Sequence, residues 1–234
     1  MKLFINTFFL TFFLSLNVFS QTAQQNSGWL FLLNSTKFND KWGMHLDVQV
    51  RSADSWDGVR NFLFRPGVSY YINKNSNATV GYLLANTYLS LDGLANSTLT
   101  EHRVWEQYIL SHKIKMVNVQ HRFRLEQRFI ETNQGDVFAQ RLRYFFRFVL
   151  PIANKQETFT KGPFVALQNE LFFNIQNKGQ LNDNLFDQNR AYGALGYRFS
   201  KSFDLEAGYL NQFSKGTLNN TMNNTIQLAI YTRF

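Results

Sequence analysis

Strict alternation of apolar and polar side chains dominates the chain, most clearly between residues 117 and 129. There, one set of alternate positions reads Val, Val, His, Phe, Leu, Gln, Phe, and the other reads Asn, Gln, Arg, Arg, Glu, Arg. A period of two residues predicts a β-strand with two different faces. The stretch alone does not show which face is inside, because a soluble sheet would bury the apolar set.

Eleven segments of this kind follow one another, separated by turn-forming residues. Many are longer than the usual five or six residues or so, and are close to the length with which a tilted strand crosses a bilayer. Tight turns, as at residues 200–202, alternate with longer connections, as at 177–186 and 214–222, although 151–162 is a long exception. This asymmetry is typical of outer-membrane barrels. It predicts an all-β, up-and-down antiparallel transmembrane β-barrel.

The segment 138–150 indicates which face is outside. Phe138, Leu142 and Phe146 belong to a bulky, aromatic face, and Arg141, Arg143 and Arg147 belong to the other. A soluble domain would bury such aromatics and expose a mixture of Lys and Glu, whereas here the strands carry Arg, Gln and Asn, and Lys occurs mostly in turns. We therefore expect aromatics toward lipid and arginines inside a closed sheet, because lipid cannot satisfy unpaired backbone groups.

The strand number does not follow directly from this pattern. Single-chain bacterial barrels have an even number of strands and both termini on the periplasmic side, and eleven segments violate this rule. We expect ten strands if residues 29–34 do not form a full strand, or twelve if one short strand is hidden.

The first twenty residues predict a cleaved secretory signal. Lys2 precedes a run of Phe and Leu, and the small or short residues Val18 and Ser20 precede Gln21. The apolar run is shorter than the roughly 20 residues of a spanning helix, and it contains Asn6 and Asn17. We expect a signal peptide at residues 1–20, a barrel at 21–234, and a location in the outer membrane of a Gram-negative bacterium.

Composition supports an apolar exterior and excludes several kinds of site. The 234 residues include 25 Phe and 10 Tyr, while charged residues make up 17%, below the typical quarter or so. The net charge of +8 could attract nucleic acid, but the arginines are spread singly instead of forming a basic run, so we expect no nucleic-acid partner. With no cysteine and no metal-like histidine spacing, we expect no cofactor and no metal site. We assign aromatics near strand ends to interfacial girdles: Trp29, Trp42, Trp56, Tyr70 and Tyr71.

The predicted inward charges must stand close together in a barrel of this size. Arginine can bridge carboxylates bidentately, so these residues can form a structural network that fills the barrel. Alternatively, an excess of Arg over Glu can line a narrow pore that favours small anions. The predicted set is Arg103, Glu106, Arg122, Arg124, Glu126, Arg128, Arg141, Arg143, Arg147, Glu170, Arg190, Arg198 and Glu206.

An outer-membrane lipid hydrolase is the alternative function. A register centred on Met116 would place Ser111 beside His121 on the lipid-facing side, an arrangement that resembles outer-membrane phospholipases. No third residue to orient His121 is apparent, and a slip of one residue would abolish the pair. We therefore assign no catalytic residue and expect the protein not to be an enzyme.

Six features occur in order along the chain: HRVWEQ from His102, RFRLEQR from Arg122, RLRY from Arg141, FDQNR from Phe186, LEAGYLNQ from Leu205, and the terminal Phe234. Together they resemble the outer-membrane β-barrel family filed as domain of unknown function 2490. The resemblance implies an outer-membrane barrel and supplies no activity, substrate or catalytic residue. Phe234 also resembles the signal that barrel-insertion machinery recognises. The expected partners are outer-membrane lipid and lipopolysaccharide, that machinery during biogenesis and, for a pore, small anions.

Overall fold

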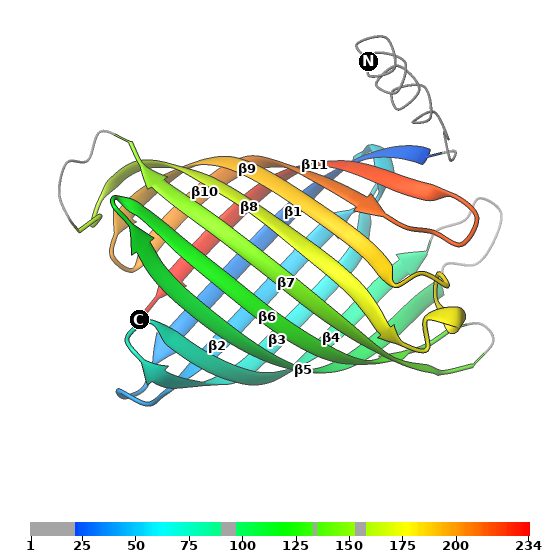
Figure 1. Cartoon of the computed structure of the whole chain (residues 1–234). Helices are drawn as coiled ribbons and strands as arrows, with labels where there is room; N and C mark the ends of the chain where they lie inside the picture. The colour runs from blue at the N-terminus through cyan, green and yellow to red at the C-terminus, as the bar shows by residue number, and fades with distance from the viewer. Residues whose placement is uncertain (1–21, 90–96, 133–134, 153–157) are drawn as a thin grey trace, which may run out of the picture.

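The computed structural model describes residues 22–89, 97–132, 135–152 and 158–234 (Figure 1). Within these ranges the chain forms eleven strands and two short 3-10 helices. No helix there is long and apolar enough to cross a membrane. The predicted signal peptide, residues 1–20, lies outside the described residues.

The strands form one closed barrel in chain order, each beside its sequence neighbours (Figure 1). Their bounds are β1 Thr22–Lys37, β2 Trp42–Ser52, β3 Val59–Asn73, β4 Ser76–Leu89, β5 Ser97–Ile114, β6 Val117–Ile130, β7 Val137–Pro151, β8 Gly162–Gln176, β9 Phe186–Ser200, β10 Phe203–Ser214 and β11 Asn220–Arg233. The helices η1, Asp54–Trp56, and η2, Lys178–Gln180, lie in the connections after β2 and β8.

The barrel closes through a parallel pair, β1 with β11, in a register that starts at Thr22↔Asn220 and ends at Ser35↔Arg233. All other neighbours are antiparallel. An odd number of up-and-down strands makes the first and last strands run in the same direction, so only a parallel pair can close the sheet. The prediction of ten or twelve strands is therefore wrong for the described chain. The even-number rule assumes antiparallel closure, whereas here Thr22 and Phe234 lie at opposite ends of the barrel.

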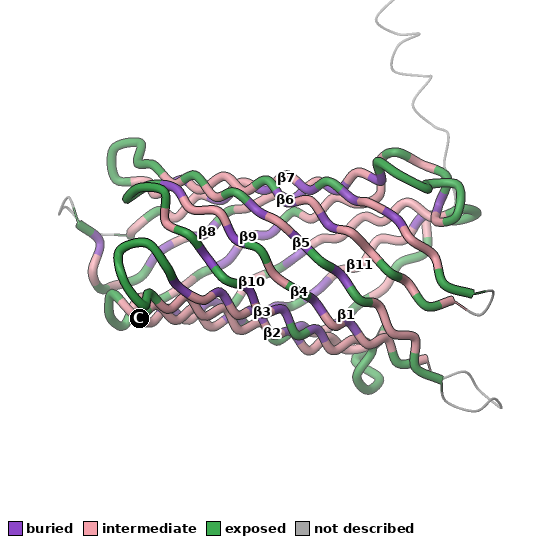
Figure 2. Tube along the Cα trace, turned by 90° about the horizontal axis from the view of Figure 1, so that it is seen from below, coloured by how far each residue is buried: buried purple, intermediate pink, exposed green. Residues whose placement is uncertain are grey.

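Burial alternates from residue to residue along much of the strands, as the colour changes along the tube show (Figure 2). In β6, Phe123 is 49% exposed, whereas Arg124 is 1% and Glu126 is 0% exposed. In β7, Leu142 is exposed while Arg141 and Arg143 are buried. The predicted arrangement, with large apolar groups outside and arginines inside a closed sheet, is confirmed.

The two ends of the barrel differ in their connections. One end carries the short turns after β3, β5 and β9, at residues 74–75, 115–116 and 201–202, together with the longer connection after β7. Lys115 adopts a left-handed conformation with φ 54°, which allows the tight turn after β5. The other end carries the connections that contain η1 and η2. The predicted asymmetry is thus present, including its exception between β7 and β8.

Candidate functional site

Twelve of the thirteen predicted lumen residues face the interior, where they are buried or line a cavity. They come from β5 to β10, and alternation along each strand places them on the inner face. They are Arg103, Arg122, Arg124, Glu126, Arg128, Arg141, Arg143, Arg147, Glu170, Arg190, Arg198 and Glu206.

Glu106 is the exception, and its placement in the lumen is wrong. It shares the outer face of β5 with Val104 and Tyr108, both exposed, and its Oε2 accepts a hydrogen bond from Gln127 Nε2 at 3.1 Å. Residues three apart on a regular strand point to opposite faces. Arg103 and Glu106 therefore cannot both be internal.

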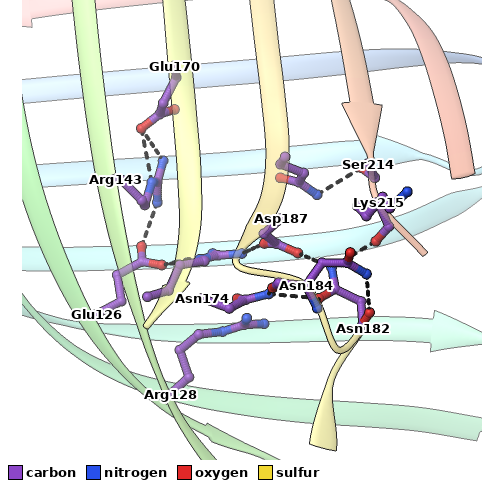
Figure 3. A network of polar contacts seen from close by, with 12 residues as sticks. Glu126, Arg128, Arg143, Glu170, Asn174, Asn182, Asn184, Asp187, Ser214 and Lys215 are labelled. Atoms are coloured by element: carbon purple, nitrogen blue, oxygen red, sulfur yellow. Dashed lines mark hydrogen bonds and ion pairs between the residues drawn. The ribbon is translucent and has the colours of Figure 1, made fainter. Parts of the chain in front are cut away.

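Glu126 is the centre of the interior network (Figure 3). Its carboxylate accepts hydrogen bonds from Arg141 at 2.8 Å and Arg143 at 2.5 Å, and it lies 3.4 Å from Arg103. Arg143 also donates to Glu170 at 2.7 Å, and Arg122 donates to the same Glu170 oxygen at 2.6 Å. Guanidinium groups therefore outnumber carboxylates in this cluster, which gives the lumen a surplus of positive charge.

The same network ties the connection after β8 into the mouth of the barrel (Figure 3). Arg141 Nη1 donates to Asp187 at 2.9 Å, and Asn182 Nδ2 donates both to Asp187 at 3.1 Å and to the carbonyl of Lys215 at 2.9 Å. Asn174 Nδ2 donates to Asn182 Oδ1 at 3.0 Å. Because Asn182 is buried, these bonds hold the connection against the barrel wall at the end that carries η2.

Some interior contacts join strands that are not neighbours in the sheet. Arg147 of β7 forms an ion pair with Glu206 of β10, and its guanidinium lies 5.0 Å from the ring of Tyr231 on β11. His45 of β2 packs edge-on against Trp105 of β5, with ring centroids 5.5 Å apart. Such contacts reach across the lumen and reduce its free width.

Trp29 lies inside the barrel, so its assignment to an interfacial girdle is wrong. It is 6% exposed, and the guanidiniums of Arg51 and Arg190 lie 3.9 and 5.2 Å from its ring. Tyr71 is also internal by the alternation of β3, with Lys37 Nζ 4.5 Å from its ring. By contrast, Trp42 and Tyr70 are exposed and pack edge-on at 5.0 Å, as a girdle requires.

Three interior arginines have no carboxylate partner among the described residues, namely Arg51, Arg124 and Arg190. Their hydrogen-bond partners are glutamines: Gln49 for Arg51, Gln107 for Arg124, and Gln188 and Gln212 for Arg190. A neutral amide satisfies donors and leaves the positive charge uncompensated. The sequence does indicate that Arg51 faces the interior, although the predicted set does not include it. Asp47, Gln49 and Arg51 alternate with Val48 and Val50.

The lumen contains two cavities, of about 730 and 220 Å³. Lys113 and Arg233 line the larger one, which lies toward the end with the short turns. Arg65, Arg143 and Arg190 line both cavities. These three arginines therefore lie between the two cavities.

The Ser111–His121 pair of the hydrolase alternative does not form. Ile114 pairs with Val117 across the turn, so Ser111 lies opposite Gln120 and His121 lies opposite Leu110. The turn is centred between residues 115 and 116 and not on Met116, and this shift of one residue puts the two side chains on opposite faces. Ser111 lines the larger cavity. His121 shares a hydrogen bond of 2.9 Å with the Tyr144 hydroxyl outside.

A closed barrel with an aromatic exterior and a charged interior defines a porin-like class of protein. The chain belongs to the family described as protein of unknown function (DUF2490), whose model matches residues 26–223. A search of curated proteins finds no match. Among solved structures, that of the NanC porin is similar with a TM-score of 0.52 and 12% sequence identity, over 86% of this chain and 90% of that chain. At this identity the likeness shows a shared fold alone.

Proposed function

We propose that the protein is an integral outer-membrane barrel that passes small anions through a narrow, arginine-lined lumen, and that it is not an enzyme. The observation that carries the proposal is that Arg65, Arg143 and Arg190 line both lumen cavities. The closed barrel and the fold that it shares with a protein named as a porin support it.

The exterior supports a membrane location. Val68, Val80, Leu195 and Ile226 are all more than half exposed, and they come from four different strands. Soluble proteins rarely expose contiguous apolar patches larger than a few hundred Å² or so. A closed sheet has no unpaired edge, so its exterior can face lipid along the whole circumference. The proposed membrane barrel explains both features at once.

The charge distribution supports selectivity for anions. The lining of the smaller cavity includes seven arginines and no carboxylate: Arg51, Arg65, Arg103, Arg128, Arg141, Arg143 and Arg190. A constriction of one charge sign concentrates ions of the opposite sign and rejects like charges. Small anions are therefore the solutes that this lumen would admit.

Conductance of the refolded full-length chain in planar bilayers tests the proposal. With a KCl gradient, we expect discrete current steps. We also expect a reversal potential closer to the equilibrium potential of chloride than to that of potassium. Arg190→Gln should at least halve the ratio of chloride to potassium permeability, because it removes a charge between the two cavities without breaking an ion pair. Arg60→Gln is the control, since Arg60 is exposed outside the cavities.

Steps without anion preference would refute the selectivity for anions, and absence of current steps would refute the pore. In that case the remaining interpretation is a structural barrel whose Arg/Glu network fills the lumen. That alternative predicts that Arg190→Gln changes stability and no transport property.

A further inference from the structure

We propose that Arg51, Trp29 and Arg190 form a binding site for a small anion that carries two phosphate or carboxylate groups. This deepens the proposed function by naming a class of solute, and the binding itself does not require conduction. The site lies between the two cavities, because Trp29 lines the larger cavity, Arg51 lines the smaller one and Arg190 lines both.

Two guanidiniums contact a single indole ring in this site. Their distances to the ring of Trp29 are 3.9 Å for Arg51 and 5.2 Å for Arg190. Trp29 belongs to β1, Arg51 to the neighbouring β2, and Arg190 to β9, which is separated from β1 by β10 and β11. The ring thus holds two positive groups that reach it from different parts of the barrel wall.

No carboxylate of the described residues is in direct contact with either positive charge of this pair. Neither arginine forms an ion pair within the described part of the chain. Glu126 and Glu170, the interior carboxylates of β6 and β8, are engaged by other arginines. Two like charges beside one ring repel each other, so an anion placed between them would be favoured electrostatically.

Both arginines also retain hydrogen-bonding capacity. Arg51 donates to Gln49 through Nε and Nη2, at 3.1 and 2.5 Å. Arg190 donates through Nε to Gln212 at 2.9 Å and through Nη2 to Gln188 at 3.1 Å. Nη1 takes no part in these bonds in either residue, so each guanidinium keeps donors for a ligand oxygen.

The shape and lining of the smaller cavity indicate the ligand class. Guanidinium groups bind the oxygens of phosphate and carboxylate with directional, charge-assisted hydrogen bonds. Two such groups and a lining without carboxylates favour a ligand with two anionic ends over a monovalent ion. Leu63 and Phe172 add apolar surface to a cavity of about 220 Å³, which suits a short linker between the two ends.

Titration of the detergent-refolded full chain with pyrophosphate and with succinate, at constant ionic strength in NaCl, tests the site. We expect saturable binding of at least one of them by calorimetry, together with a change in tryptophan fluorescence. Trp29→Phe should abolish most of that fluorescence change. Arg51→Gln and Arg190→Gln should each weaken binding at least tenfold.

Arg233→Gln is the matched control, because Arg233 lines only the larger cavity and its partner Asp204 keeps Arg198. It should bind like the unmodified protein, and heat-modifiable gel migration should show that every variant is folded. Binding of pyrophosphate alone identifies a phosphate site, and binding of succinate alone a dicarboxylate site.

No saturable binding of either probe, or binding that survives Arg51→Gln and Arg190→Gln, would overturn the site. Failure of the site and failure of the pore are distinguishable. Anion-selective current without binding refutes only the site, and binding without current refutes only the pore.

Discussion

Four interior carboxylates of this barrel each pair with more than one arginine, namely Glu101, Glu126, Glu170 and Asp204. Glu101 accepts hydrogen bonds from Arg103 and Arg128, and Asp204 accepts them from Arg198 and Arg233. A buried charge is tolerated only when it is paired and hydrogen-bonded. The sharing pairs each of these four carboxylates with two or more guanidiniums and leaves a net positive lumen. Stability and selectivity therefore depend on the same side chains.

Replacing Glu126 tests this dependence. Glu126→Gln would leave three neighbouring arginines without their shared carboxylate, so we expect the free energy of unfolding to fall by about 3–5 kcal/mol. Glu106→Gln is the same chemical change on the outer face of the neighbouring strand. This substitution should leave the free energy of unfolding unchanged, because a carboxylate that faces lipid gives no such stabilisation. Unfolding of each variant by guanidinium chloride in phospholipid vesicles measures its free energy of unfolding. An equal decrease in the two variants would contradict the network.

At the scale of single residues, alternation alone predicts most of the interior charged residues. It predicts none of the ion pairs that they form with distant strands. The period of two places Arg122, Arg124 and Glu126 on one face whatever the strand number. The Arg147–Glu206 pair, by contrast, depends on how the wall curves around the lumen. Glu106 was misplaced because it was grouped by charge with Arg103, although the spacing of three puts them on opposite faces.

At the scale of the strand, β1 explains why the strand number could not be predicted. Its central residues, from Trp29 to Leu33, are all apolar, so no alternation separates the two faces. Trp29, Phe31 and Leu33 line the larger cavity, while Leu30 is exposed outside. An apolar inner face cannot be recognised by a pattern that expects polar groups inside. In other strands the alternation is clear because the inner positions carry polar groups, as Arg122, Arg124 and Glu126 do in β6.

The parallel β1–β11 pair gives a prediction specific to eleven strands. Leu30 lies opposite Leu228 in this register, and both side chains are exposed outside. Because the chain has no native cysteine, Leu30→Cys with Leu228→Cys should form a disulfide, which a mobility shift on non-reducing gels detects. The control pair, Leu30→Cys with Ile230→Cys, is displaced along β11 and should not react. Cross-linking of the control in place of the test pair would mean a different register, and no cross-link in either would refute the closure.

For the whole molecule, parallel closure separates the ends of the barrel chain. β1 starts at the end that carries η1 and η2, and Phe234 lies at the end with the short turns (Figure 1). Phe234 donates its backbone N–H to the carbonyl of Ser35 at 3.0 Å, so the last residue of the chain extends the pairing with β1. Asn182 and the larger cavity therefore lie toward opposite ends of the barrel. In the proposed membrane barrel, these ends would face different sides of the membrane.

Cysteine labelling in cells tests this sidedness directly. Gln24→Cys and Lys178→Cys lie at one end of the barrel, and Lys201→Cys lies in the short turn at the other. With a membrane-impermeant maleimide, we expect Gln24→Cys and Lys178→Cys to react together in intact cells, and Lys201→Cys to react only after lysis. The mirror result would place the short turns outside and still support opposite ends. If Gln24→Cys and Lys201→Cys both react in intact cells, or both react only after lysis, the two positions lie on the same side. That result would contradict the parallel closure, because an even-stranded barrel puts those two positions on one side.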